Sequence, residues 1–209
     1  MSTRIEADFG AITKEAREIS EKSRAIARNI VKGDAPEDRI RRRCVIATGD
    51  PAFADLMRFE NEPVKAGIQA IKKGTPIFTD IRMVQVGITK RGHNCEVRCA
   101  LDAGSEIART TGATRTSAGF MALEKELEGA IIVIGNAPSA ALTVCGMIER
   151  GLAPELIIAT PVGFVNASES KERVRALRVP SITCVGTRGG TPVAVAVVNE
   201  LVEMAAGKS

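Results

Sequence analysis

The chain has 209 residues, of which 44% are hydrophobic, and this predicts one globular unit with a sizeable core. The core must be aliphatic, because the chain contains only six Phe and neither Tyr nor Trp. The net charge is only +4, and the absence of a basic block, an aromatic stacking surface and zinc-finger spacing argues against a nucleic-acid partner. No apolar run approaches the roughly 18 residues that span a membrane, and the five scattered cysteines are typical of reduced thiols, so we expect a cytoplasmic protein with no membrane partner.

The first predicted element is a long helix over residues 11–33, which Gly33 can end. Apolar side chains recur there at three- and four-residue steps and form one face, made of Ile12, Ala16, Ile19, Ile26 and Ile30. Ser23 lies on the same face. A serine in that position commonly bonds back to a helix carbonyl, and it is only a weak sign of a pocket.

A second helix is predicted to begin at Pro36 and to run to about Thr48. Proline and the two acidic residues that follow it both suit the N-terminus of a helix. Arg43 and Ile46 then lie one turn apart on the same side. After the Asp-Pro pair at 50–51 we expect a short helix carrying Phe53, Leu56 and Met57, and residues 61–74 form another capped helix.

Strand and helix patterns alternate in the rest of the chain. Short buried strands are predicted at residues 76–81, 94–101, 129–135, 154–161 and 181–186. Helical patterns occupy residues 114–129, 139–151, 167–178 and 191–205. This alternation predicts an α/β fold with a mainly parallel central sheet, helices on both faces and a single domain covering residues 1–209.

The segments that follow the predicted strands are the natural place for a ligand, because open parallel sheets bind ligands at the carboxyl ends of their strands. These segments are Asp80 and the Gly- and Pro-rich stretches 135–140, 161–171 and 186–190. Their backbone N–H groups suit an anionic ligand. Arginines near the same ends suit carboxylates, although an ordinary surface charge is the commoner reading of any one of them. No dinucleotide, P-loop or nucleophile-elbow motif is present.

The single histidine, His93, supports two weaker hypotheses. It has the same strand parity as Cys95 and Cys99, but three zinc ligands from one strand would be unusual, so we expect no metal site. Imidazole also suits general acid–base catalysis. The surrounding TKRGHNC is typical of an exposed turn, and a solvated histidine is the better interpretation.

Taken together, the loops resemble a known family. The segments TGDPAFADLMRF, TDIRMVQVGI, TRTSAGF, IGNAPSAAL, PVGFVNASESK and GTRGGTPVAVAVVN occur in this order from about Ile19 to Glu203. They closely resemble the precorrin-8X methylmutases, the precorrin isomerases of cobalamin biosynthesis. IGNAPSA and PVGFVNASESK are the most specific of these segments, because they are long, unusual and jointly present.

The resemblance implies an isomerase that shifts a methyl group between neighbouring carbons of a tetrapyrrole-derived macrocycle, precorrin-8X or its cobalt-containing analogue. It also implies a homodimer, a deep pocket and no external cofactor. The residues that we expect to bind this substrate, from the resemblance and from their places near the strand ends, are Ser23, Arg43, Asp80, Thr114, Arg115, Gly135, Asn136, Ala137, Pro138 and Arg188.

One position departs from the family pattern. Family members read Arg-x-x-His before the ATGD-like segment, and that histidine is the proposed proton donor; here the stretch is Arg43-Cys44-Val45-Ile46. The resemblance therefore places Ile46, which has no proton to give, at the catalytic position. Either the shift proceeds with a proton from another group or from water, or His93 reaches the pocket, or the protein is a relative that binds or carries a corrinoid without converting it. An unrelated nucleotide- or phosphate-binding α/β protein would be favoured only if the family segments were coincidental.

Overall fold

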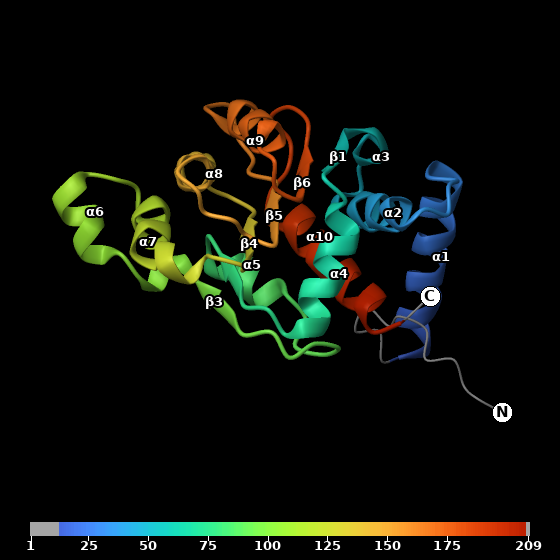
Figure 1. Cartoon of the computed structure of the whole chain (residues 1–209). Coiled ribbons are helices and arrows are strands. Elements are labelled where there is room, and N and C mark those ends of the chain that lie inside the picture. The colour runs from blue at the N-terminus through green and yellow to red at the C-terminus, as the bar shows by residue number, and fades with distance from the viewer. Residues whose placement is uncertain (1–12, 208–209) are drawn as a thin grey trace.

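The computed structural model describes residues 13–207, which fold around one six-stranded sheet (Figure 1). The strands are β1 (Met57–Glu60), β2 (Ile77–Thr79), β3 (Val97–Cys99), β4 (Ile131–Ile134), β5 (Leu156–Ala159) and β6 (Ser181–Cys184). Their spatial order is β1-β6-β5-β4-β2-β3, and β1 alone runs antiparallel to its neighbour. The predicted mainly parallel α/β sheet is therefore confirmed.

The central strands are buried because their sequences are continuous apolar runs. β4 reads IIVI and β5 reads LIIA, and every residue of both is buried. Alternate side chains of β4 enter different cores: Ile131 and Val133 face one, and Ile132 and Ile134 face the other. A strand covered on both faces needs apolar residues at every position, and this is why these segments could be recognised from the sequence.

Helices cover both faces of the sheet. The first core lies under α2 (Pro36–Thr48), α4 (Pro63–Lys73), α5 (Arg82–Gly87) and α10 (Thr191–Ala205). The second lies under α7 (Arg115–Leu123), α8 (Pro138–Glu149) and α9 (Ala167–Ala176). Short 3₁₀ turns occupy Ala100–Asp102 and Glu124–Glu126.

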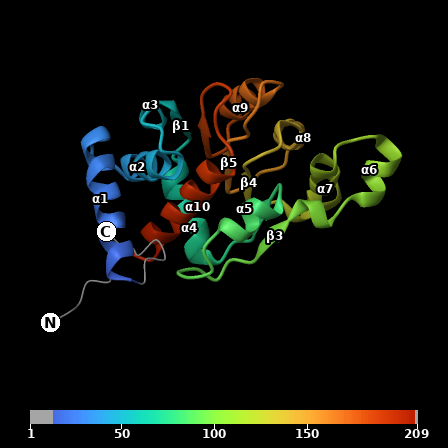
Figure 2. The same ribbon diagram turned by 180° about the vertical axis from the view of Figure 1, so that it is seen from behind.

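Two helices lie at opposite ends of the molecule, as Figures 1 and 2 both show. α1 (Lys14–Ile30) packs against α2, and α6 (Ser105–Thr111) packs against α7. The apolar face predicted for α1 is largely uncovered, since Ile19 is 58% exposed and Ile26 is 62% exposed. Residues 11 and 12 of the predicted helix, Ile12 among them, lie outside the described residues.

The predicted caps of α2 are present. The N–H of Ala35 donates to Asp38 Oδ2 at 3.1 Å, and Pro36 occupies the first turn. Gly49 ends the helix in the left-handed conformation, with φ of 66°. A residue with a side chain would be strained there, so this glycine fixes where α2 stops.

Three elements were missed by the sequence prediction: β1, α5 and α6. Met57 was expected in a short helix, but that helix, α3 (Phe53–Leu56), ends before it, and Met57 is the first residue of β1. The strand reads MRFE, and two charges in four residues hide any strand pattern. Pairing with β6, more than 120 positions away in the sequence, makes it a strand.

Candidate active site

The loops expected to bind the ligand do meet along one edge of the sheet, which we call the carboxyl edge. It is formed by the segments that follow β2, β4, β5 and β6. Because β1 is antiparallel and Met57 pairs with Cys184, the connection from α2 to β1 reaches the same edge. β2 and β6 are three strand positions apart, which is about 14 Å at the usual strand spacing. A ligand that contacts all of these loops must be large.

Asp80 is buried below the carboxyl edge and fixes the backbone of the loop after β4. Its side chain is fully buried and accepts hydrogen bonds from the backbone N–H groups of Gly135 at 3.1 Å, Asn136 at 2.8 Å and Ala137 at 2.8 Å. Burial raises the pKa of the Asp80 carboxyl, and these backbone N–H groups act in the opposite direction. Asp80 therefore holds the loop after β4, and its carboxylate is not presented to a ligand.

The loop after β4 exposes little besides one amide side chain. Gly135 and Ala137 are buried, whereas Asn136 is exposed and Pro138 begins α8. A Cβ at Gly135 would come within 2.7 Å of Val84 on α5, so no larger residue fits. The three backbone N–H groups that we expected to bind an anion are instead bonded to Asp80, and that expectation is corrected here.

Thr114 and Arg115 lie beside this loop. The Oγ1 of Thr114 caps α7 by accepting from the N–H of Ser117, and it lies 2.9 Å from the Oγ of Ser139 near the start of α8. Arg115 is the first residue of α7, and its side chain is exposed. The two helix N-termini are thus joined, and Arg115 stands at their junction with its guanidinium open to solvent.

The loops after β5 and β6 are bonded to one another. The N–H of Gly190 donates to the carbonyl of Thr160 at 2.7 Å, and the N–H of Gly163 donates to that of Thr187 at 3.0 Å. Arg188 is exposed, and its Nη1 donates to Oδ2 of Asp50 at 3.0 Å, which connects the β6 loop to the end of α2.

Phe164, in the loop after β5, was not selected as a site residue from the sequence. It is 94% exposed. An aromatic side chain left in solvent on a loop of the carboxyl edge is a candidate for ligand contact. The signal that could have found it is its place inside the specific segment PVGFVNASESK.

Arg43 does not reach the carboxyl edge. Its Nη1 lies 3.0 Å from Glu200 and 2.8 Å from Glu203, both on α10, and its side chain is only 11% exposed. Glu200 also pairs with Arg39 at 2.8 Å. These buried ion pairs hold α2 against α10, so the visible role of Arg43 is structural.

Ser23 lies on α1, away from the other predicted residues. Its Oγ donates to the carbonyl of Ile19 at 3.0 Å, as a serine in a helix commonly does. Figures 1 and 2 show α1 at one end of the molecule and α7, which begins at Arg115, toward the other. Within one chain, Ser23 and Arg115 do not come together.

His93 lies at the opposite edge of the sheet, because it precedes the first residue of β3. Its Nδ1 accepts from the N–H of Cys95 at 3.0 Å, and its Nε2 lies 2.6 Å from the carbonyl of Thr89. Both ring nitrogens are therefore occupied, and His93 does not reach the carboxyl edge. Among residues 13–207 no group of three His, Cys, Asp or Glu side chains is arranged to hold a metal ion.

Ile46 lies in the last turn of α2, three residues before the glycine that ends the helix, and it is partly exposed. The segment that follows it carries Asp50, the partner of Arg188. The end of α2 that carries Ile46 is therefore linked to the β6 end of the carboxyl edge, and a place for Ile46 at the site stays a prediction.

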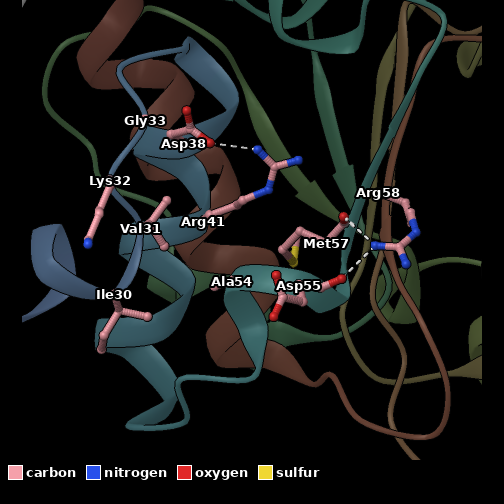
Figure 3. Close-up of a pocket in the computed structure, with 10 residues that line it drawn as sticks. All are labelled: Ile30, Val31, Lys32, Gly33, Asp38, Arg41, Ala54, Asp55, Met57 and Arg58. Carbon is pink, nitrogen blue, oxygen red and sulfur yellow. Dashed lines mark hydrogen bonds and ion pairs between the residues drawn. The ribbon is translucent and has the colours of Figure 1, made fainter.

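A separate groove lies on the outer side of β1, where it is enclosed by the α1–α2 connection, α2 and α3 (Figure 3). Its volume is about 390 Å³, and its lining includes Lys32, Arg41 and Arg58. Arg41 pairs with Asp38 at 2.7 Å, and Arg58 donates to backbone carbonyls. None of the predicted site residues lines this groove.

Comparison with known proteins identifies the family of this chain. The family model of precorrin-8X methylmutase matches residues 18–204. The chain belongs to the precorrin-8X methylmutase family. It is 41% identical over 209 residues to the cobalt-precorrin-8 methylmutase of Methanocaldococcus jannaschii, covering 94% of this chain and 98% of that protein. It is 36% identical over 180 residues to the precorrin-8X methylmutase of Pseudomonas aeruginosa, covering 83% of this chain and 86% of that protein.

The precorrin-8X methylmutase of Thermus thermophilus has a similar solved structure, with a TM-score of 0.84 and 34% sequence identity. The match covers 91% of this chain and 97% of that one. The predicted family and the isomerase class are therefore confirmed, together with the α/β fold. Within residues 13–207, no helix is both long and apolar enough to cross a lipid bilayer.

Proposed function

We propose that this protein converts precorrin-8X or cobalt-precorrin-8 by an intramolecular methyl shift at the carboxyl edge. The observation that carries the proposal is the convergence of the family-specific loops along this edge, over about 14 Å between the ends of β2 and β6. In the reaction, the bond from the methyl group to one ring carbon breaks as the bond to the neighbouring carbon forms. The composition of the macrocycle does not change, so we propose that no external cofactor takes part.

The exposed side chains of the edge suit a flat polycarboxylate. Arg115 begins α7 next to Thr114, which contacts the start of α8 after β4, and Arg188 follows β6. Arginine forks bind carboxylates bidentately. Asn136 offers an amide, and Phe164 offers an aromatic face to the apolar body of the macrocycle. Asp80 and Thr114 then act indirectly, because they hold the backbone that presents these groups.

We further propose a homodimer in which the second copy covers α1. The exposed isoleucines of α1 form one side of the helix and are costly to leave in water. Ser23 lies on that side, so a partner subunit would bring its own Ser23 to a site that a single chain cannot complete. Sedimentation should give a dimer for the natural protein and a monomer for Ile26→Glu. A monomeric natural protein would contradict this assembly.

We also propose that the whole chain, residues 1–209, forms one domain in the cytoplasm. The sheet combines strands from both halves of the chain, and β1 pairs directly with β6. All five cysteines are buried and unpaired, which suits a reducing compartment.

The test of the reaction uses purified protein and cobalt-precorrin-8 with oxygen excluded. The visible spectrum is followed, and the extracted pigment is identified by NMR. We expect the methyl-shifted product to form faster than in a protein-free control. A macrocycle that binds but stays unchanged would instead make this a corrinoid-binding relative, with Ile46 as the physical reason.

A further inference from the structure

Lys171 is unusual for a lysine because it is buried in the protein interior. It lies on α9, and its side chain is fully buried. Among the described residues no carboxylate pairs with it: its Nζ donates to the backbone carbonyl of Arg188 at 2.6 Å and lies 3.6 Å from Cys184 Sγ. Burying an ammonium group with so few partners is costly.

The hydrogen bond from Lys171 Nζ holds the backbone carbonyl of Arg188 in place. The thiol of Cys184 also donates to the Arg188 carbonyl, at 3.2 Å, so two buried donors from different elements meet at one backbone oxygen. Burial lowers the pKa of Lys171, and the neighbouring sulfur of Cys184 opposes this shift. Burial likewise raises the pKa of Cys184, and Lys171 opposes that.

The loop needs such an anchor because its sequence does not fix its shape. It reads GTRGG, and Gly186, Gly189 and Gly190 all have positive φ. Glycine leaves the backbone many alternative conformations. A Cβ at Gly189 would come within 2.3 Å of the carbonyl of Thr160, so that glycine cannot be replaced by a stiffer residue.

We propose that Lys171 is a positioning residue, which holds the main chain of Arg188 so that the exposed guanidinium meets a carboxylate of the macrocycle. This rests on the proposed function, which places Arg188 on the substrate. Lys171 itself stays buried and does not touch the ligand. A purely structural lysine would support the stability of the fold and leave substrate binding unchanged.

The test is a double-mutant cycle on the dissociation constant of cobalt-precorrin-8, measured by visible absorbance without oxygen. Arg188→Ala removes the guanidinium and leaves the backbone carbonyl in place. We expect Arg188→Ala to weaken binding about tenfold or more, as the loss of a charged hydrogen bond does. Lys171→Met should weaken it by a similar factor, and the double variant should bind no worse than either single variant.

Arg175→Met is the matched control. Arg175 is also on α9, and its Nη1 donates to Oγ1 of Thr183 on β6, so the variant removes a cation that links the same two elements. It should leave the dissociation constant unchanged within twofold. If the effects of Lys171→Met and Arg188→Ala multiply, or if Lys171→Met binds normally, Lys171 does not position Arg188.

A second measurement does not depend on ligand binding. Hydrogen exchange of the backbone over residues 185–190 should be faster in Lys171→Met, and in Lys171→Gln if the Met variant does not fold, but not in Arg175→Met. Unchanged exchange would overturn the proposal. Failure of the proposed function has a different signature: the natural protein would bind the macrocycle without converting it, or would not bind it, while the exchange result would still hold.

Discussion

Replacing Asp80 with Asn tests whether the buried carboxylate shapes the carboxyl edge. The amide can keep its oxygen toward the N–H groups of Asn136 and Ala137, but its NH₂ then faces the N–H of Gly135. Each hydrogen bond to a charged acceptor contributes roughly 1.5–3 kcal/mol to stability. Asn loses the hydrogen bond from Gly135 and weakens those from Asn136 and Ala137, which together costs roughly 3–5 kcal/mol of unfolding free energy. Removing the buried charge returns part of this, because burial disfavours the carboxylate and raises the pKa of Asp80. We expect a net loss of about 2 kcal/mol.

The assay is thermal unfolding at neutral pH. A loss of about 2 kcal/mol in a chain of this size lowers Tm by about 4–8 °C. Hydrogen exchange at residues 135–137 should also become faster. The matched control is Asp34→Asn, whose carboxylate is fully exposed and 3.8 Å from Arg42, and its unfolding free energy should change by less than about 0.5 kcal/mol. If Asp80→Asn melts at the same temperature or higher, the cost of burying the charge outweighs the hydrogen bonds, and our account of the loop fails.

Three further predictions address catalysis, packing and pH. Ile46→His should raise single-turnover conversion of cobalt-precorrin-8 by about 10²-fold or more with little change in binding, and an unchanged rate would mean that no proton donor acts there. Arg43→Met should lower the unfolding free energy by about 2 kcal/mol, because it breaks the buried pairs with Glu200 and Glu203, and should leave KM unchanged; a raised KM at an unchanged Tm would place Arg43 on the substrate. Burial raises the pKa of Cys145 from about 9 to about 11, so unfolded thiols ionise first and stability should fall between these pH values. Denaturant titrations should show a shallower fall for Cys145→Ala, and equal slopes would contradict the prediction.

Much of the fold could be predicted from local signals. The apolar runs of β4 and β5 and the proline and glycine that bracket α2 lie where the sequence placed them. The missed strand β1 shows the limit, since Arg58 and Glu60 carry charges and only pairing with β6 makes the segment a strand. Local pattern predicts an element when burial is uniform along it, and fails when a distant partner supplies the hydrogen bonds.

The candidate site likewise has features that the sequence predicts and features that it does not. The segments that form the carboxyl edge could be recognised from their residues, because their glycines, prolines and family-specific order are local properties. Which polar side chains of these segments are exposed to a ligand depends on the fold. Arg115 and Arg188 are exposed there, although Arg188 also pairs with Asp50, whereas Asp80 is buried and bonded to backbone N–H groups and Arg43 is bonded to glutamates of α10. The physical reason is that a charged side chain binds whatever partner the fold brings within reach, and spacing along the chain does not specify that partner.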